Sequence, residues 1–388
     1  MNPTDLNFAF PTRVIFGPGK LRNLASMHLP GEKALLVITS DRIVEQLGIL
    51  DKVITYLSKN DCSYHIYDGI TSNPTKNEIM IGKELANEEN CEFTIGIGGG
   101  SSIDSAKCIS AMMRMEGDLW NYTPYGSGKG LPVTDAAPII AISTTSGTGT
   151  ETNGGAVITH DETREKVYVS SFYMRPTFSI IDPELMCSLP KHLTAFQGYD
   201  AIAHASECFI AKDCNQFAEM FALEILRIVS KWLPYAYEEP NNIEARSWIA
   251  YAADILGGMV QTLSPTTSAH TIGEAISGHF SSVQHGASLA VIAEAYYSKF
   301  ANKIPDRLDQ MGAVMGETPD GTGQGYLNAL IQLLDSTGIR NISLSEHGIN
   351  VNDLDKIAHY ACNVVGFSAD RYDVTIDDVK EILLKSYR

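Results

Sequence analysis

The stretch Thr94-Ile-Gly-Ile-Gly-Gly-Gly-Ser-Ser-Ile-Asp-Ser-Ala-Lys107 decides how the first half of this chain folds. An apolar run suited to a buried strand leads into three glycines, Gly98 to Gly100, and then into a helical segment. Glycines let the backbone approach an anion closely, and the free N–H groups of a new helix face the same point. The spacing of these glycines differs from the dinucleotide-binding fingerprint G-x-G-x-x-G. The sequence therefore fits a phosphate-binding turn and a ligand-free strand-to-helix turn equally well. We expect Ser101 to cap the helix and Asp104 to favour its dipole.

A second polar turn, Ser143-Thr-Thr-Ser-Gly-Thr-Gly-Thr-Glu151, follows the apolar run Pro138 to Ile142. Its dense hydroxyls can bind phosphate or ribose oxygens, although Ser/Thr/Gly clusters are also common in plain loops. Ligands of an open parallel sheet bind beyond the carboxyl ends of its strands, which is where both turns must lie. Two turns that converge support a nucleotide site more strongly than either turn does alone.

Outward from these turns, the sequence predicts an α/β half and a helical half. Helical segments, including 42–59 and 76–90, alternate with β-branched runs, which predicts a parallel Rossmann-like sheet over residues 1–183. Beyond Pro183 the alternation stops, and residues 184–388 read as an all-helical domain with turns at Pro190, Pro234, Pro240 and Pro265. The expected strands lie at 34–39, 63–67, 93–97, 138–143 and 178–181, and the expected helices of the second half include 215–233, 245–263 and 288–301.

Composition excludes several classes of protein. The 388 residues suit two domains, and a net charge of −17 without a basic cluster argues against nucleic-acid binding. No apolar run is long enough to span a membrane, and the N-terminus does not resemble a signal peptide. The seven cysteines are scattered without a C-x-x-C pair, as in a reduced protein. We therefore expect a cytoplasmic protein.

The helical half contains a possible metal site. Asp200 and His204 are four residues apart, so they share one face of a helix, and His270, His279 and His285 fall within sixteen residues. A helix-surface hydrogen bond also explains the Asp/His pair by itself. Because both groups are embedded in apolar or small residues, where an unpaired charge is costly, a bound metal becomes an equally good explanation.

Together these residues resemble the iron-containing, or group III, alcohol dehydrogenases over nearly the whole chain. The resemblance implies a dehydroquinate synthase-like architecture, with a nucleotide-binding α/β domain followed by a helical domain. The motifs that carry it are Phe10-Pro-Thr-Arg-Val-Ile-Phe-Gly-Pro-Gly19, Asn73-Pro-Thr75, Gly98-Gly-Gly-Ser-Ser-Ile-Asp-Ser-Ala-Lys107, Thr144-Thr-Ser-Gly-Thr148 with Glu151, Ile181-Asp-Pro183, Asp200-Ala-Ile-Ala-His204 and His285-Gly286.

The resemblance also implies site residues. A residue after the second strand would read the adenosine ribose; Asp41 would accept from the 2′-OH and repel a 2′-phosphate, so NAD is favoured over NADP, with Ser40 as the alternative position. The implied metal is Fe²⁺, although the ligand types also suit Zn²⁺ or Co²⁺. The implied metal ligands are Asp200, His204, His270 and His285; the implied pyrophosphate turn is Gly99, Gly100 and Ser101; and Asp104, Thr144, Thr145, Thr148 and Lys166 are expected near the cofactor.

Two positions depart from the family pattern. Members usually carry another histidine four residues after the third ligand, for proton transfer or substrate contact, and this chain has Glu274 there. Glu274 is our candidate catalytic residue, either as a proton carrier or, as we favour, as an orienter of a ligating imidazole. The spacing from His270 to His285 is also one residue longer than usual, which makes His279 a rival to His270.

The implied activity is the reversible oxidation of a small or medium primary alcohol to its aldehyde, with hydride transfer to NAD. Because sheet edges in such domains often pair across a twofold axis, we expect a homodimer. Two rivals are a dehydroquinate synthase-like lyase and a nucleotide-binding protein that has lost catalysis. The lyase needs a basic phosphate pocket, and few Lys or Arg lie near the predicted ligands. The complete ligand set argues against the second rival.

Overall fold

The computed structural model describes residues 6–387, which divide into two compact units. One unit is Phe10–Ser188, and the other contains residues 189–387 together with 6–9. Pro183, where the sequence suggested a boundary, begins the 3₁₀ helix Pro183–Met186 of the first unit. Among residues 6–387, no helix is both long enough and apolar enough to cross a bilayer.

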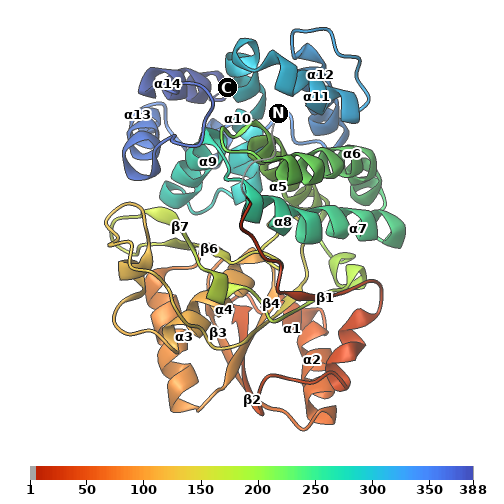
Figure 1. Cartoon of the computed structure of the whole chain (residues 1–388), viewed down its shortest axis with the longest axis vertical. Coiled ribbons are helices and arrows are strands. Elements are labelled where there is room, and N and C mark those ends of the chain that lie inside the picture. Colours follow the sequence, from red (N-terminus) through yellow and green to blue (C-terminus); the bar gives the residue numbers. More distant parts are fainter. Residues whose placement is uncertain (1–5, 388) are drawn as a thin grey trace. The chain divides into compact units, whose positions relative to one another are not determined.

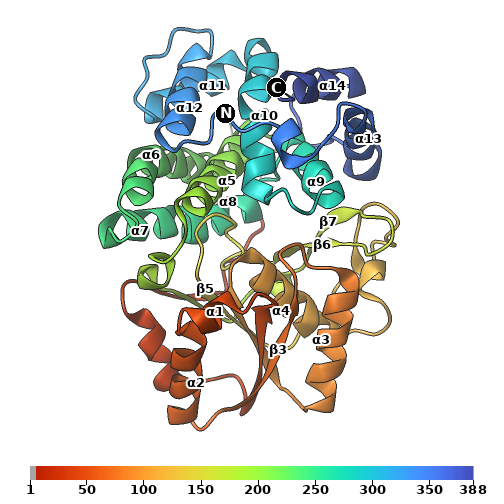
Figure 2. The ribbon, with the colours of Figure 1, turned by 180° about the vertical axis from the view of Figure 1, so that it is seen from behind.

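The first unit is built on a six-stranded, all-parallel sheet with the order β1-β8-β5-β4-β2-β3. Figure 1 shows this sheet with helices on both sides, and the reverse view in Figure 2 agrees. The strands are β1 (Arg13–Phe16), β2 (Lys33–Thr39), β3 (Ser63–Ile70), β4 (Phe93–Gly98), β5 (Ile139–Ser143) and β8 (Phe178–Ile181), and a separate antiparallel hairpin is formed by β6 (Gly155–Thr159) and β7 (Lys166–Ser170).

Helices cover the two faces of the sheet because its strands are apolar on both sides. Every residue of β4 and β5 is buried, as expected for central parallel strands. The side chains of α2 and of the 3₁₀ helix Lys20–Ala25 join a buried cluster with Leu36, Ile95 and Ile142. The helices of this unit are α1 (Ile43–Gln46), α2 (Ile49–Lys59), α3 (Lys76–Glu88) and α4 (Gly100–Met112).

The strand order creates a switch point between β2 and β4. The chain goes from β2 to β3 on one side and from β4 to β5 on the other, while β2 and β4 pair directly through Val37 and Gly96. Ligands of doubly wound sheets bind beyond the carboxyl ends of the strands at such a point. The glycine turn lies there, directly after β4.

The second unit is helical, as predicted. Its longest helices, α5 and α6, pack against one another, and α10 packs against α5, α9 and α14. The helices are α5 (Lys191–Ile210), α6 (Gln216–Glu238), α7 (Ile243–Ala250), α8 (Gly257–Leu263), α9 (Ser268–His279), α10 (His285–Phe300), α11 (Pro305–Val314), α12 (Gln324–Ser336), α13 (Asp353–Tyr360) and α14 (Ile376–Lys385).

Three local predictions were wrong. The single helix expected over 42–59 is two helices, because Gly48 adopts a left-handed conformation at φ 66° and interrupts it. The helix expected over 245–263 contains a π-helical turn, Tyr251–Leu256, between α7 and α8. Pro234 ends no helix, since α6 continues to Glu238 with Leu233 and Ala236 buried in the core.

Candidate active site

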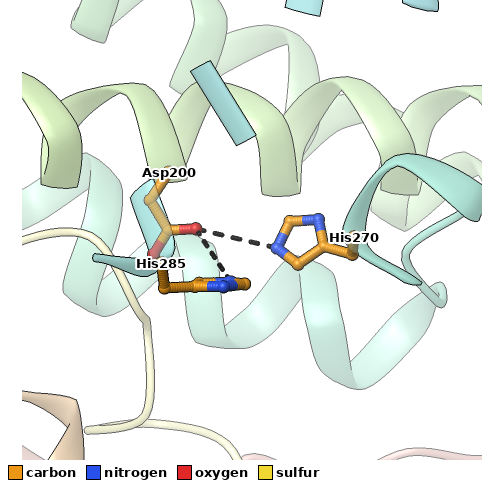
Figure 3. A group of neighbouring side chains, drawn as sticks. All are labelled: Asp200, His270 and His285. Carbon is orange, nitrogen blue, oxygen red and sulfur yellow. Dashed lines mark ion pairs between the residues drawn. The ribbon is translucent and has the colours of Figure 1, made fainter. Parts of the chain in front are cut away.

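The metal-site residues lie on three helices of the helical unit. Asp200 and His204 project from one face of α5, His270 lies in the first turn of α9, and His285 begins α10. Figure 3 shows Asp200, His270 and His285 turned toward one another. Asp200 and His270 are each 4% exposed and His204 is 8% exposed, whereas the His285 side chain is 28% exposed. Residues far apart in the sequence therefore form one buried cluster.

One oxygen of Asp200 faces an imidazole nitrogen of each of the three histidines. Asp200 Oδ1 lies 3.6 Å from Nδ1 of His204, 3.6 Å from Nε2 of His270 and 3.8 Å from Nε2 of His285. Ligand atoms held at about 2.0–2.2 Å from a tetrahedral metal are separated by roughly 3.3–3.6 Å. The cluster thus has nearly the spacing that a metal requires.

The polar atoms of the cluster support the same interpretation. Asp200 Oδ1 and His270 Nε2 are both buried, and neither has a hydrogen-bond partner within residues 6–387. Buried polar groups are normally hydrogen-bonded, so two facing buried atoms without such partners are suited to binding a cation. Burial opposes ionisation of Asp200, but the neighbouring histidines outweigh it and lower its pKa to about 2. Asp200 is therefore an anionic ligand at neutral pH.

The four expected ligands are not equivalent. The potential ligand atoms of Asp200, His270 and His285 all lie within 4.8 Å of one another, and His204 is outside that group. The His204 ring nevertheless lies beside the His270 ring, tilted by 34° with 4.4 Å between the ring centroids. Asp200 is thus central to the cluster and His204 is at its edge.

The rival ligand His279 lies at the other end of α9. Its Nδ1 is 3.0 Å from the Ala275 carbonyl oxygen, and its ring packs edge-on against Tyr360 with 4.7 Å between the centroids. His279 is not among the described residues that group into a potential metal site. Of the two alternatives, His270 is the one that the structure brings to Asp200.

Sequence reasoning missed Glu207, a fully buried residue of α5. Its Oε1 lies 2.6 Å from Nδ1 of His270. Glu274 was expected to orient a ligating imidazole, but for His270 this place is taken by Glu207. A single carboxylate in an apolar helix has no distinctive spacing; the only signal was its position three residues after His204.

The two polar turns of the α/β unit converge at the carboxyl edge of the sheet. β4 and β5 pair up to Gly98 and Ser143, and the Thr144 N–H donates to the Gly98 carbonyl oxygen at 3.0 Å. A Cβ on Gly99 would lie 3.0 Å from Thr145 Cγ2, and one on Gly100 would lie 2.9 Å from Thr148 Cγ2. The turns therefore touch, and a side chain at either glycine would press against a threonine methyl group.

The helix cap expected of Ser101 was wrong, and Asp104 has contacts that were not expected. Gly99 is the N-cap, without a side-chain cap, and the Ser101 hydroxyl donates instead to the Ser72 carbonyl oxygen at 2.7 Å. Asp104 accepts from the Thr150 hydroxyl at 2.5 Å and from the Val157 N–H at 2.9 Å. Asp104 therefore ties α4 to the second turn and to β6, rather than only complementing a helix dipole.

A buried lysine that we did not predict reinforces this junction. Lys107 is fully buried, and its ammonium donates to the Thr150 hydroxyl, the Asn153 side-chain oxygen and the Gly155 carbonyl oxygen at 2.6–3.1 Å. Burial lowers its pKa to about 8. Glu151 is also fully buried, and its carboxylate accepts from the Ser143 hydroxyl at 2.5 Å. The buried ionisable side chains of Lys107 and Glu151 thus hydrogen-bond to residues of the second turn.

The remaining cofactor candidates lie around the same edge of the sheet. Asp41 follows β2 and is exposed, and its Oδ1 accepts from the Thr39 hydroxyl at 2.7 Å and the Ile43 N–H at 3.1 Å. Lys166 begins β7 and is 6% exposed; its ammonium donates to the Asn73 side-chain oxygen at 2.8 Å. Asp41 therefore follows the strand at the switch point, where a ribose-reading residue is expected.

Comparison with known proteins follows this division of the chain. Residues 11–183 match the family described as iron-containing alcohol dehydrogenase, and residues 194–387 match its C-terminal domain. The chain belongs to the iron-containing alcohol dehydrogenase family. Members of this family are oxidoreductases that interconvert alcohols and aldehydes, and this protein is one of them.

Relatives of this alcohol dehydrogenase resemble it over nearly its whole length. Alcohol dehydrogenase 4 of Schizosaccharomyces pombe is 30% identical over 97% of this chain and 87% of its own. The 1,3-propanediol dehydrogenase of Citrobacter freundii is 30% identical over 92% of each chain. An archaeal halo-thermophilic alcohol dehydrogenase from a Red Sea brine pool superposes with a TM-score of 0.93, at 30% identity and with complete coverage of both chains. These relatives confirm the family and its two-domain fold.

Proposed function

We propose that this protein is a divalent-metal-dependent, NAD-linked dehydrogenase of small or medium primary alcohols and the corresponding aldehydes. The observation that carries the proposal is the buried cluster in which one oxygen of Asp200 lies 3.6–3.8 Å from nitrogens of three histidines. Relatives named for NAD-dependent methanol, NADH-dependent butanol and 1,3-propanediol dehydrogenation support this substrate class.

The metal ligands in this proposal are Asp200, His204, His270 and His285, and Fe²⁺ is the proposed ion, with Zn²⁺ as the alternative. When bound, the metal supplies Lewis-acid polarisation of the alcohol oxygen, and NAD supplies the hydride acceptor. The chain itself would hold the ion, through one carboxylate and three imidazoles. The greater exposure of His285 supports substrate access from its side of the cluster.

The proposed NAD site combines the glycine turn with the residue after β2. Gly99, Gly100 and Ser101 would offer backbone N–H groups of the first turn of α4 to the pyrophosphate. Asp41 would accept from the ribose 2′-OH. Arg42, the nearest cation in sequence, is already paired with Glu45 and Asp68 at 2.5 and 3.2 Å. A phosphate on that ribose would therefore meet the Asp41 carboxylate without a free arginine beside it. The other proposed cofactor contacts are Asp104, Thr144, Thr145, Thr148 and Lys166.

Glu274 is the proposed catalytic side chain that replaces the family histidine. It lies four residues after His270 on α9 and therefore shares the ligand-bearing face of that helix, and it is partly exposed. Because Glu207 holds Nδ1 of His270, Glu274 has no nitrogen of that ring to orient. This supports a role in carrying the alcohol proton or contacting the substrate.

Assembly and location are proposed at the level of the whole chain. We propose a homodimer, since β1 forms one edge of the sheet and exposed edge strands commonly pair across a twofold axis. We also propose a cytoplasmic location, which the seven cysteines support, since none of them forms a disulfide within residues 6–387.

A single assay tests the proposed function. The purified protein is loaded anaerobically with Fe²⁺ or with Zn²⁺ and given NAD and a series of primary alcohols, and the absorbance of reduced nicotinamide is followed. We expect absorbance that depends on alcohol, NAD and metal together. The metal-free protein is the control, and activity that persists in it would contradict the proposal, as would complete inactivity of the loaded protein toward every alcohol and aldehyde.

A further inference from the structure

The helix that supplies two of the proposed metal ligands also carries a third inward-facing polar residue. Asp200, His204 and Glu207 follow one another on α5 at spacings of four and three, so all three project from one face of the helix. Glu207 is 0% exposed and lies within the apolar core of the helical unit. An ionised carboxylate so placed needs hydrogen-bond donors on both oxygens.

Glu207 finds these donors at the start of α9, where His270 lies. Its Oε1 is 2.6 Å from Nδ1 of His270. Its Oε2 accepts from the N–H groups of Thr267 and His270 at 2.9 and 3.0 Å and from the Thr267 hydroxyl at 3.1 Å. The positive end of a helix favours a negative charge at this point. Glu207 therefore fixes both the backbone and the ring of the same ligand.

The contact with Nδ1 decides what the opposite nitrogen of the ring can do. A carboxylate acceptor at 2.6 Å requires a proton on Nδ1, so a neutral His270 carries its lone pair on Nε2. That nitrogen is the buried atom without a hydrogen-bond partner that faces Asp200 Oδ1 at 3.6 Å. The tautomer that Glu207 selects is thus the one that can bind a cation.

We propose that Glu207 is a positioning residue for the metal centre. It holds His270 in the ligating tautomer and ring orientation and makes Nε2 a stronger donor, without touching substrate or cofactor. The proposal rests on the proposed metal function of this cluster. It assigns to this chain a carboxylate–histidine–metal arrangement in which the carboxylate comes from the same helix face as Asp200 and His204.

A purely structural role would be different: Glu207 would only cap the first turn of α9. The chain provides a matched control for this possibility in Asp370, another buried carboxylate at the same helix end. Asp370 accepts from the Ser268 N–H at 3.0 Å and the Ser268 hydroxyl at 2.7 Å. Replacing the Asp370 carboxylate therefore weakens the start of the same helix, α9, without removing a carboxylate from an imidazole.

The test compares Zn²⁺ dissociation constants, measured by competition with a chromogenic chelator, for the wild type, Glu207→Gln and Asp370→Asn. Glutamine keeps the volume and one acceptor but removes the charge. We expect Glu207→Gln to raise the dissociation constant by about 10- to 100-fold, the effect typical of such partners of metal ligands. Asp370→Asn should leave it close to the wild-type value. The visible absorption of the cobalt-saturated protein should change only in Glu207→Gln.

Three outcomes of the zinc measurement overturn the proposal, and they are distinguishable. If the wild type binds zinc and Glu207→Gln binds it equally well, or if both variants lose affinity alike, Glu207 is a structural cap and the metal function stands. If the wild type binds no divalent metal, the proposed metal function fails together with this inference.

A measurement on the wild type covers the case in which Glu207→Gln does not fold. In the ¹⁵N-histidine-labelled, zinc-loaded protein, the proposal requires a proton on Nδ1 of His270, and ligation through Nδ1 would refute it.

Discussion

At the scale of single residues, the choice between His270 and His279 as a metal ligand has a direct test. His270 faces Asp200 at 3.6 Å, whereas His279 packs against Tyr360 with its Nδ1 at the Ala275 carbonyl oxygen. We predict that His270→Ala loses the bound metal and the activity, and that His279→Ala retains both. Metal content per chain, measured by elemental mass spectrometry, decides the question. A metal-replete His270→Ala protein together with a metal-free His279→Ala protein would reverse the assignment.

Asp41 allows the coenzyme preference to be tested without disturbing the local backbone. Its Oδ1 accepts two short-range hydrogen bonds, so Asp41→Asn can keep them while removing the charge. We predict that Asp41→Asn raises the use of NADP relative to NAD by about tenfold. Repulsion of a 2′-phosphate of about 1.4 kcal/mol, which charges near a protein surface reach at an effective dielectric constant near 20, gives that ratio. The ratio of kcat/KM for the two coenzymes measures it, and an unchanged ratio would direct attention to Ser40.

Glu274 is the third residue with a separable prediction. If it carries the alcohol proton, Glu274→Gln should lower kcat by about 100-fold or more, the usual contribution of a general acid or base. One ionisation should also disappear from the pH–rate profile, while Zn²⁺ affinity stays at the wild-type level. The matching measurement is zinc affinity by chelator competition. Weakened metal binding with an unchanged pH profile would show instead that Glu274 supports a ligand.

At the scale of an element, the second polar turn contains a titrating group that couples stability to pH. Burial raises the pKa of Glu151 to about 7, from 4.5, and the hydrogen bond from Ser143 only partly offsets this. Between these pH values the folded protein retains a proton that the unfolded chain releases. The contribution of Glu151 to stability is therefore complete below pH 4.5 and is lost as the pH rises through 7.

This predicts a pH-dependent difference between Glu151→Gln and the wild type. From about pH 5 to about pH 8, the variant should gain stability relative to the wild type, by roughly 1–3 kcal/mol in the free energy of unfolding. Urea unfolding at several pH values measures the gain. Parallel pH dependence in the two proteins would show that Glu151 ionises in the folded state as it does in the unfolded chain.

The elements also show how far local sequence predicts this fold. The β-branched runs predicted β2, β3, β4, β5 and β8, because strands buried on both faces are continuously apolar. The edge strand β1 and the β6–β7 hairpin were not predicted, and because they are as short as the predicted strands β8 and β5, length does not explain the difference. Helix breaks followed backbone conformation and tertiary packing: Gly48 adopts positive φ, whereas Pro234 is retained inside α6.

The site was predictable where spacing carried information and not elsewhere. Asp200 and His204 share a helix face because of their four-residue separation, and that relation is visible in the sequence. Glu207 and Lys107 act through partners 63 and 43–48 residues away. Such contacts follow from the tertiary fold and leave no local pattern. Sequence reasoning therefore missed these two buried charged residues, whose contacts arise only in the tertiary fold.

At the scale of the whole molecule, the proposed metal ion and the proposed NAD are bound by different units. All four proposed metal ligands lie on α5, α9 and α10 of the helical unit, and the glycine turn and the second turn lie in Phe10–Ser188. Each unit has an extensive buried apolar cluster of its own. Each ligand should therefore stabilise the unit that holds its contacts, by an amount set by its concentration and affinity.

Hydrogen exchange under native conditions tests this division. With Zn²⁺ alone at about 100 times its dissociation constant, amides of α5, α9 and α10 should exchange up to about 100-fold more slowly, which corresponds to about 2.7 kcal/mol. Amides of α4 and of residues 144–151 should be unaffected by zinc and slowed by NAD alone. The control is Mg²⁺, which prefers oxygen ligands and should protect neither unit. Because all the proposed zinc ligands lie in one unit, equal slowing of exchange in both units by zinc alone would contradict that ligand set. Protection by NAD that is confined to α9 and α10 would contradict the proposed cofactor turn.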